Sequence, residues 1–334
     1  MNDVARHAGV SQATASRAFG GRGYASAEVK EKVLRAAREL GYRPHAVARS
    51  LRMQRTNTLG LLIGDIINPF YAHLADGVLD CAQQSGYHVI LSAHGENPAL
   101  EKEYLEVLVQ QRVDGIVAVA TGQNLDLWRE AQRLGTRLVF VDRRLQEFPD
   151  SDSFLVDNVK GAHDMVRYMT GLGHRRIGII IGPPLTTTGE GRLQGYYDAL
   201  EQAGVAIDRD LVRICTFRRE SGRQAAGELL SMDEPPTAIF AANNVLGEAA
   251  LFVIREKGLR IPEEISLGIF DDVPWASLTA PPITAVAQPA FQLGHLSAER
   301  LISRLEEEDS AAPPACVTLD PKLIVRESCR AYAG

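Results

Sequence analysis

Apolar strand-like runs alternate with amphipathic stretches along most of the chain, from about residue 57 onward. Glycines end most of the amphipathic stretches, and such alternation predicts parallel sheets covered by helices, an α/β fold. The strand-like runs are Leu59–Ile66, His88–Ser92, Gly115–Ala120, Leu138–Val141, Ile177–Ile181, Val212–Thr216, Ala238–Ala241 and Ile265–Phe270. The alternation breaks around Arg143–Asp152, where a polar segment replaces a helix, and then resumes, so we expect two similar lobes.

The two predicted lobes face a common ligand position. Ligands of open α/β sheets bind beyond the carboxyl ends of the strands, so two facing lobes would share a cleft. We place the first lobe at about residues 57–150 plus 287–312, and the second at about residues 151–286 plus 313–334.

Residues 2–41 predict a different unit, made of three short helices. Val4, Ala5 and Ala8 give the inner face of the first helix, and Gly9 permits a sharp turn. Ser11 is a suitable N-cap for a second helix over Gln12–Phe19, with Ala15, Ala18 and Phe19 pointing inward. A third helix follows Ser26, with Val33, Ala37 and Leu40 as its buried stripe and Gly41 at its end. This order is typical of an all-α helix-turn-helix domain.

Charge is distributed unevenly between these units. The whole chain carries a formal charge of -6, yet residues 1–55 hold nine Arg and two Lys against four acidic residues. A basic head on an acidic body indicates a polyanion-binding module, although a chance cluster on a solvated face gives the same count.

Other function classes find no support in the sequence. No apolar run is long enough to cross a bilayer, and the charged start MNDVARHAGV does not resemble a signal peptide, so we expect a cytoplasmic protein. The four scattered cysteines predict neither disulfides nor a zinc site. Phosphate-loop, zinc-protease and nucleophile-elbow motifs are missing, and Gly189-Glu190-Gly191 lacks the third glycine of a dinucleotide fingerprint. We therefore expect no catalysis, no cofactor and no metal.

Many separate motifs together resemble the LacI-type (lactose/galactose repressor) family of bacterial transcription regulators. They run in order along essentially the whole chain: DVARHAGVSQATASRAFGG, KVLRAARELGYRPHAVARSLR, TNTLGLLIGDIINPFYAHL, QRVDGIV, VFVDRR, GLGHRRIGIIIGP, GRLQGYYDAL, AIFAANN, GLRIPEEISLGIFDD, PPITAVAQP and LIVRESC. The resemblance implies a helix-turn-helix domain at residues 1–43, a hinge at 44–56, and an effector-binding and dimerisation body at 57–334 with lobes of the type I periplasmic-binding-protein kind.

The resemblance also implies a homodimer that reads a pseudo-palindromic operator with its second helix in the major groove. Gln12, Ala13 and Arg17 would meet base edges, since Gln pairs with adenine, Arg with guanine, and Ala contacts a thymine methyl. Ser11, Thr14 and Ser16 would contact phosphates. For Arg17, a salt bridge within the head is the alternative.

The matching hinge, PHAVARSLR, would form a short helix on DNA. Leu51 would enter the minor groove and kink the duplex, while Arg49 and Arg52 contact phosphates. Packing of Leu51 between domains is the alternative. The head departs from the family at its start, where Asn2 would serve as the cap of the first helix.

Similarity places the effector site between the lobes. The implied contacts are Arg192, Asp271, Asn243, Gln288 and Asp142 for polar groups, with Phe70, Tyr71, Phe217 and Trp275 as apolar walls for a sugar ring. For each aromatic residue, ordinary core packing is the alternative.

The function implied is a repressor whose operator affinity is controlled by a small molecule, a sugar or sugar derivative. A periplasmic-type sugar-binding protein without a DNA role is the alternative, and it would need an export signal and no basic head. A nucleotide-dependent enzyme is a further alternative, and it would need phosphate-binding glycines.

Overall fold

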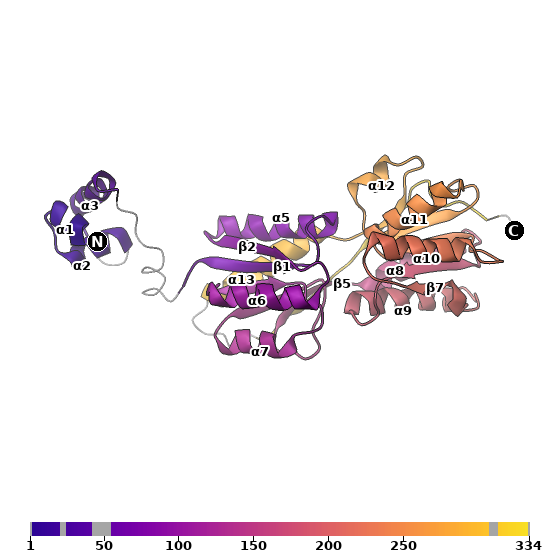
Figure 1. Ribbon diagram of the computed structural model, residues 1–334, viewed down its shortest axis with the longest axis horizontal. Helices are drawn as coiled ribbons and strands as arrows, with labels where there is room; N and C mark the ends of the chain where they lie inside the picture. The colour runs from indigo at the N-terminus through magenta and orange to yellow at the C-terminus, as the bar shows by residue number, and fades with distance from the viewer. Residues whose placement is uncertain (1, 21–24, 42–54, 307–312, 333–334) are drawn as a thin grey trace. The chain divides into compact units, whose positions relative to one another are not determined.

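The computed structural model describes residues 2–20, 25–41, 55–306 and 313–332 (Figure 1). The chain forms two compact units, residues 1–56 and residues 57–334, which we call the head and the body and describe separately.

Three helices build the head: α1 (Asn2–His7), α2 (Gln12–Gly20) and α3 (Ala27–Glu39). Their small core consists of Val4, Ala5, Ala15, Ala18, Val33, Ala36 and Ala37. The predicted turn at Gly9 is confirmed by its φ of +67°, and Ser26 caps α3 by accepting from the N–H of Val29. His7 and Glu39 join α1 to α3, with 2.7 Å between Nε2 and Oε2.

Two expectations for the head were wrong. Leu40 is 45% exposed, because α3 ends at Glu39 and Ala36 fills the stripe instead. Asn2 is the first residue of α1 rather than a cap before it. The prediction for the Phe19 side chain lies outside what the structure describes.

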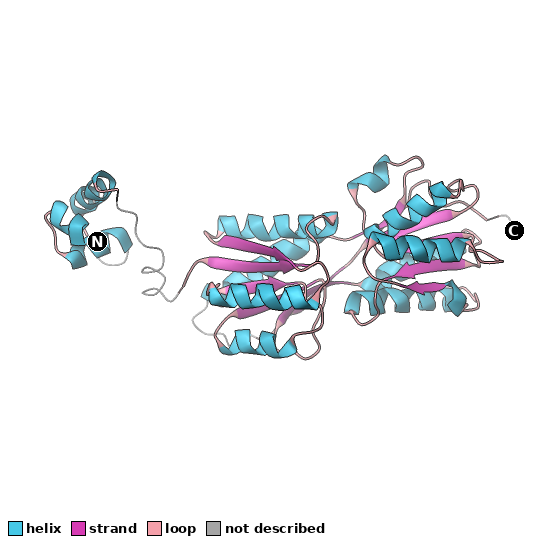
Figure 2. Ribbon diagram, in the orientation of Figure 1, coloured by secondary structure: helices cyan, strands magenta, loops and turns pink. Residues whose placement is uncertain are grey.

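The body contains two six-stranded sheets (Figure 2). The strands are β1 (Thr58–Ile63), β2 (His88–Ala93), β3 (Gly115–Ala118), β4 (Arg137–Val141), β5 (Asp152–Val156), β6 (Ile177–Ile181), β7 (Val212–Ile214), β8 (Ala238–Ala241), β9 (Ser266–Phe270), β10 (Thr284–Ala287), β11 (Cys316–Leu319) and β12 (Lys322–Ile324). The first sheet has the order β11-β5-β4-β3-β1-β2 and is parallel throughout. The second has the order β12-β10-β9-β8-β6-β7, and β12 is antiparallel to its neighbour.

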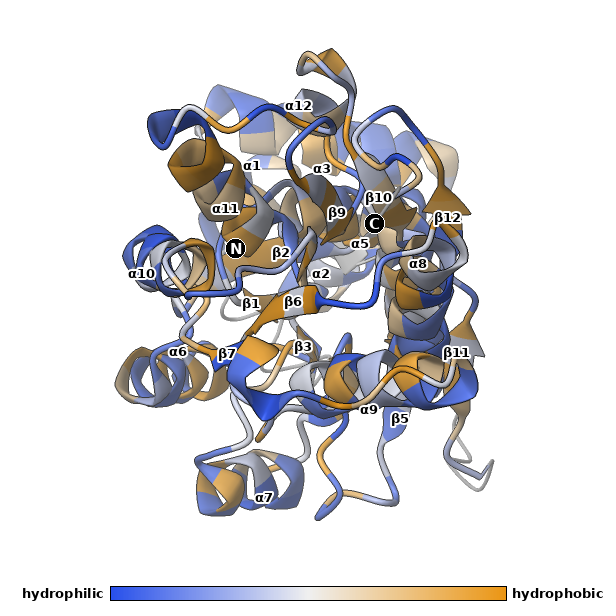
Figure 3. Ribbon diagram, turned by 90° about the vertical axis from the view of Figure 1, so that its right-hand side faces the viewer, coloured by the Kyte–Doolittle hydropathy of each residue, from blue (hydrophilic) through white to orange (hydrophobic). Residues whose placement is uncertain are grey.

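Helices cover both faces of each sheet. They are α5 (Pro69–Gln84), α6 (Pro98–Gln110), α7 (Leu125–Arg133), α8 (Asn158–Gly171), α9 (Thr187–Gln202), α10 (Arg219–Leu230), α11 (Asn244–Glu256), α12 (Pro274–Leu278) and α13 (Ala290–Glu306), with one 3-10 turn, η1 (Arg209–Leu211). Central strands such as β6 and β8 are buried along their whole length, as expected for strands covered on both faces. Figure 3 shows the second lobe end-on, with the strongly apolar β6 between flanking helices.

The hydrophobic cores show which helices cover which face of each sheet. In the first lobe, α5 and α13 share one core with the sheet, and α6 and α7 share another. In the second lobe, α8 and α9 cover one face, while α10 to α12 cover the other. Helices α5 and α13 approach very closely, because a Cβ on Gly77 would collide with the backbone at Phe291 and one on Gly294 with the backbone at Leu74.

The prediction of two parallel-sheet lobes is confirmed, and each of the eight predicted runs overlaps a strand. The lobe boundaries were misplaced, because β5 and β11 hydrogen-bond within the first sheet. The chain therefore crosses between lobes after Val156 rather than at residue 150, and again between β11 and β12. A further crossing connects β10 to α13, so three segments join the lobes.

Candidate functional site

A cavity of about 480 Å³ lies between the lobes, and we call it the interlobe cavity. Its walls combine polar and apolar side chains from both lobes. Its lining residues are Asp65, Asn68, Phe70, Tyr71, Gly95, Glu96, Asp142, Arg143, Thr188, Arg192, Thr216, Phe217, Arg218, Asn243, Val245, Asp271 and Gln288.

Two aspartates hold matching positions at the ends of strands. Asp142 directly follows β4 in the first sheet, and Asp271 directly follows β9 in the second. Both have left-handed backbone conformations, with φ of +67° and +75°, which Asp tolerates better than most residues. Both are buried and line the interlobe cavity, so each lobe contributes one carboxylate at the carboxyl end of its sheet.

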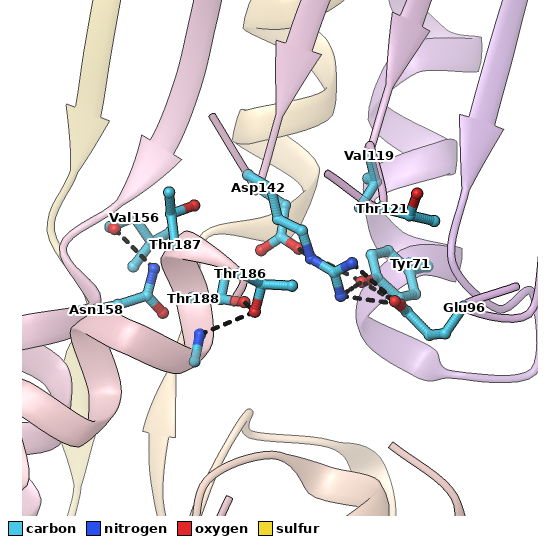
Figure 4. A network of polar contacts seen from close by, with 12 residues as sticks. Tyr71, Glu96, Val119, Thr121, Asp142, Val156, Asn158, Thr186, Thr187 and Thr188 are labelled. Carbon is cyan, nitrogen blue, oxygen red and sulfur yellow. Dashed lines mark hydrogen bonds and ion pairs between the residues drawn. The ribbon is translucent and has the colours of Figure 1, made fainter. Parts of the chain in front are cut away.

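An ion-pair network forms the first-lobe wall (Figure 4). Arg143 donates from Nη1 and Nη2 to the two carboxylate oxygens of Glu96, at 2.7 and 2.8 Å. The hydroxyl of Tyr71 donates to Asp142 Oδ2 at 3.4 Å and accepts from Arg143 Nη2 at the same distance. Arg143 Nε lies 3.8 Å from Asp142 Oδ2.

The two carboxylates of this wall have opposite pKa shifts. Burial raises the pKa of Asp142 to about 6, and the nearby charges of Arg143 and Arg192 only partly oppose this. Burial also acts to raise the pKa of Glu96, but the charge and hydrogen bonds of Arg143 outweigh it and hold that pKa below its usual range. Asp142 is thus the less compensated of the two carboxylates.

Arg192 anchors the second-lobe wall. It lies near the start of α9, 5% exposed, with its guanidinium carbon 3.8 Å from the centre of the Phe270 ring. Nε donates to Asn158 Oδ1 at 2.8 Å, and Nη1 donates to the carbonyl oxygen of Ala242. No described residue accepts from Nη2, so this end of the guanidinium remains available to a ligand.

Asp271 is held by amide groups. Its Oδ2 accepts from the backbone N–H and the side-chain Nδ2 of Asn244, at 3.1 and 2.9 Å, and its Oδ1 accepts from Gln288 Nε2. A carboxylate has about four acceptor positions, which leaves one for a ligand. The Oε1 of Gln288 is buried and has no hydrogen-bond partner among the described residues.

Aromatic side chains contribute the apolar part of the cavity. Phe70 and Tyr71 meet edge to face, with ring centres 5.1 Å apart. The ring of Phe217 lies against Gly182, where a Cβ would overlap it, and its centre is 5.5 Å from the Arg143 guanidinium carbon. Phe217 therefore brings an apolar surface beside the ion-pair network.

Eight of the nine predicted effector contacts line this one cavity: Phe70, Tyr71, Asp142, Arg192, Phe217, Asn243, Asp271 and Gln288. Trp275 does not. It lies on α12, packs against the core of the second lobe, and lines an adjoining cavity of about 380 Å³ instead. Contact between these eight residues and a ligand stays a prediction.

Sequence reasoning missed other groups in the wall, above all Glu96 and Arg143. A signal for both was present, because Glu96 follows β2 and Arg143 follows β4, and the carboxyl ends of parallel strands meet at one edge of the sheet. Asn68 was also missed, although it lies two residues before the predicted Phe70 in the motif NPFY.

The predicted DNA-reading side chains gather on α2. Ser11, Gln12, Ala13 and Arg17 are exposed, and Thr14 and Ser16 are partly exposed. Ser11 Oγ accepts from the N–H of Thr14 at 3.1 Å, which confirms it as the cap of α2. Arg17 bonds within its own helix, from Nε to the carbonyl oxygen of Ala13 at 3.3 Å, and no described acidic residue pairs with it. Arg49, Leu51 and Arg52 lie outside the described residues.

Metal and membrane features are absent from the part of the chain that the structure describes. It holds no group of three His, Cys, Asp or Glu side chains arranged to bind a metal ion. None of its helices combines the length and apolar character needed to cross a membrane.

Comparison with known proteins identifies the family. Residues 1–45 match the family of bacterial regulatory proteins called lacI, and residues 166–329 match a periplasmic binding protein-like domain. The HTH-type transcriptional regulator DegA of Bacillus subtilis is 35% identical over 98% of this chain and 96% of its own length. The chain belongs to the lacI family of bacterial regulatory proteins. This lacI-family protein is therefore a DNA-binding transcriptional regulator rather than an enzyme.

Solved structures of family members agree over nearly the whole chain. The complex of the transcriptional regulator CelR with cellobiose is 32% identical, with a TM-score of 0.76 and coverage of 98% of both chains. The lac repressor dimer bound to operator and the anti-inducer ONPF is 26% identical, with a TM-score of 0.83 and the same coverage. The fold predicted from the motifs of this lacI-family chain is confirmed.

Proposed function

We propose that this lacI-family regulator represses transcription by binding a pseudo-palindromic operator as a homodimer, and that a sugar or sugar derivative in the interlobe cavity changes its operator affinity. The observation that carries the proposal is the convergence of buried polar groups from both lobes on one cavity, with Asp142 from the first lobe and Arg192 and Asp271 from the second. A ligand that bonds both walls favours one relative orientation of the lobes over others.

The coupling follows from that preference. If the orientation of the lobes affects the hinge at residues 44–56, occupation of the cavity changes DNA affinity, and DNA changes ligand affinity by the same factor. Such coupling is typically about 1–3 kcal/mol. Related structures hold cellobiose in one case, and operator with an anti-inducer in another.

DNA reading is assigned to the exposed face of α2. Gln12, Ala13 and Arg17 would meet base edges, and Ser11, Thr14 and Ser16 would contact phosphates. The proposed hinge contacts are Leu51 in the minor groove and Arg49 and Arg52 on the backbone. A protein that acts on operator DNA works in the cytoplasm, where we place this chain.

The test combines two measurements on the full chain. An operator is first selected from a random pool of double-stranded DNA, and calorimetry then screens pentoses, hexoses, disaccharides, their phosphates and purines. Any sugar that binds is added to an operator shift assay. Release or tightening of the operator supports the proposal. Failure to select any DNA sequence would favour a sugar-binding protein without a DNA role, and DNA binding that no panel member alters would overturn the sugar assignment.

A further inference from the structure

Two carboxylates of the first-lobe wall compete for one arginine. Glu96 occupies both terminal nitrogens of Arg143, at 2.7 and 2.8 Å, in the bidentate arrangement that binds a guanidinium most strongly. Asp142, next to Arg143 in the chain, has its Oδ2 3.8 Å from Nε, which is beyond hydrogen-bond distance. This Nε is buried and makes no hydrogen bond to the described residues. An approach of about 1 Å would bring it within hydrogen-bond distance of Asp142.

The hydroxyl of Tyr71 stands between the same two carboxylates (Figure 4). It lies 3.4 Å from Asp142 Oδ2 and 3.5 Å from Glu96 Oε1, and it has one proton to donate. Both distances are longer than an ordinary O–H···O hydrogen bond. Among the described residues, this long contact is the one hydrogen bond that the Asp142 carboxylate receives. Asp142 therefore lacks the close partner that Glu96 has.

The surroundings of Glu96 hold its carboxylate in this place. Its backbone N–H donates to Nδ1 of the buried His94 at 3.2 Å, and Nε2 of His94 lies 2.9 Å from the carbonyl oxygen of Val119. Gly64 leaves room for the side chain, because a Cβ there would lie 2.6 Å from Glu96 Oε1 and 2.7 Å from Cε2 of Tyr71. Glu96 is thus directed toward Arg143 by its backbone and by the absence of a side chain at position 64.

The hold of Glu96 on Arg143 determines what Asp142 can do. Arg143 is 4% exposed, and a buried guanidinium that loses one anionic partner is strongly favoured to find another. Asp142 already faces its Nε, so an Arg143 released by Glu96 would pair with Asp142. That pairing would neutralise the Asp142 carboxylate and occupy its acceptor positions, which otherwise face the interlobe cavity.

We propose that Glu96 is a positioning residue of the interlobe cavity: by engaging both ends of Arg143, it withholds this arginine from Asp142 and keeps the Asp142 carboxylate open to the cavity. A ligand contact at Asp142 rests on the proposed function. The hold of Glu96 on Arg143 does not, and it can be tested without a ligand.

The pKa of Asp142 reports whether Arg143 has turned. Burial raises this pKa to about 6, so the ionised carboxylate destabilises the folded chain at neutral pH, and the penalty is relieved as the pH falls below 6. The unfolding free energy of the full chain minus that of Asp142→Asn should therefore bend near pH 6. The charged and titratable groups that face Asp142 are Arg143, Arg192, Asp271, Glu96 and Tyr71.

Glu96→Gln should move this bend down by at least about one pH unit, because a directly paired arginine lowers a carboxyl pKa by about 1–3 units. The bend is again read by comparison with the same chain carrying Asp142→Asn. Glu103→Gln, a change at an exposed carboxylate on α6, is the matched control and should leave the bend in place.

Arg143→Gln separates the turned arginine from the lost charge of Glu96. In chains that carry Arg143→Gln, the further change Glu96→Gln should move the bend by less than about half as much, since no arginine is released. An equal shift with and without Arg143 overturns the inference, because the lost charge alone then accounts for it.

A crystal structure of Glu96→Gln decides the point if Arg143→Gln fails to fold. We expect nitrogens of Arg143 at about 3 Å from the Asp142 carboxylate, and an Arg143 still bonded to residue 96 overturns the inference. If neither variant folds, the wild-type bend decides, because a bend near the ordinary value of about 4 would mean that Asp142 is already paired. Failure of every sugar to bind would remove the proposed function without altering any of these results.

Discussion

Asn244 Nδ2 donates a hydrogen bond to Asn68 Oδ1 at 2.8 Å, and this buried contact joins the second lobe to the first. Each residue also makes a hydrogen bond within its own lobe. Asn68 caps α5 by accepting from the N–H of Phe70 at 3.0 Å, and Asn244 donates to Asp271 at 2.9 Å. The bond thus connects a helix N-terminus in one lobe to a carboxylate that lines the interlobe cavity in the other.

Asn244→Ala should lower the free energy of unfolding by about 1–3 kcal/mol, because it removes a donor from two buried acceptors. Urea unfolding of the full chain measures this change. Gln224→Ala is the matched control, since Gln224 is exposed and, among the described residues, bonds only to Glu228 on its own helix. We expect it to stay within about 0.5 kcal/mol of wild type. An equal effect of the two changes would mean that the interlobe bond adds nothing.

Arg17→Ala should relax DNA sequence preference while the head stays folded. Arg17 is exposed on α2 and makes no contact outside its helix among the described residues, so its removal leaves the core intact. Loss of a bidentate guanine contact costs about 1–3 kcal/mol of discrimination. Competition between the selected operator and scrambled DNA measures it. Arg17→Lys keeps the charge without the planar fork, so it should retain non-specific binding and still lose preference. If both variants keep the sequence preference of the wild type, Arg17 does not contact the bases.

Arg192→Ala should abolish the effector response and leave operator binding intact. The change removes the free Nη2 donor from the interlobe cavity, and α9, which carries Arg192, lies in the body rather than the head. It should also lower the thermal stability of the body, because Asn158 and the Ala242 carbonyl lose a buried partner. An operator shift assay with and without ligand, run well below the unfolding temperature, provides the measurement. Loss of operator binding in this variant would contradict the separation of the two activities.

Binding of a neutral sugar should weaken as the pH falls from 7.5 to 5. The pKa of Asp142 is raised to about 6, so acidification converts its carboxylate from a strong acceptor to a neutral acid. A hydroxyl donor favours the ionised form, and the complex is therefore lost as the pH falls through that pKa. Charged and titratable groups facing Asp142 are Arg143, Arg192, Asp271, Glu96 and Tyr71. Calorimetry at several pH values should show this weakening in wild type, and a flatter profile in Asp142→Asn. If sugar affinity depends on pH in the same way in wild type and in Asp142→Asn, another group causes the weakening.

His174 should make the folded chain less stable in mild acid. Its ring bonds Thr237 Oγ1 at 2.8 Å and Ser266 Oγ at 3.0 Å, and burial lowers its pKa below the usual value. The neutral ring is favoured in the folded state, so its stabilisation is complete above about pH 6.5 and declines as the pH falls below that value.

The measurement compares unfolding free energies of a chain carrying His174 with one carrying His174→Gln, between pH 5 and 7.5. Both chains also carry Asp142→Asn, because the raised pKa of Asp142 stabilises the folded state as the pH falls through 6 and would oppose the effect. A steeper loss of stability in acid is expected with His174 present. If the unfolding free energy falls with pH at the same slope in both chains, His174 does not cause the loss of stability in acid.

The sequence predicted the lobes well because fully buried parallel strands appear as continuous apolar runs. Strand β6, with the sequence IGIII, is such a run. The strand β5 reads DSFLV and begins with two polar residues after a proline-containing segment, so nothing marked it as part of a sheet. The short edge strands β11 and β12 are exposed at alternate positions or weakly apolar, and only pairing with distant segments defines them.

The candidate site was predicted from the family resemblance. Asp142 and Asp271 belong to the motifs VFVDRR and GLRIPEEISLGIFDD, and the structure places each of them directly after a strand, at the carboxyl end of its own sheet. The role of Arg143 depended on its bond to Glu96, far away in the sequence, which no local pattern reveals. Trp275 was misplaced because an aromatic residue on a short helix has the same sequence signature whether it faces a ligand or the core.

The segment from β11 to β12 has a consequence for folding. Only Asp320 and Pro321 separate these strands, yet β11 completes the first sheet and β12 the second. Neither sheet is complete without residues 316–324, and a truncation before Cys316 would leave β5 and β10 as open edges at once. Exposed edges of this kind recruit other chains. The strands β11 and β12 thus link the completion of one sheet to the completion of the other, and a chain that ends before Cys316 is expected to aggregate rather than persist as one intact lobe.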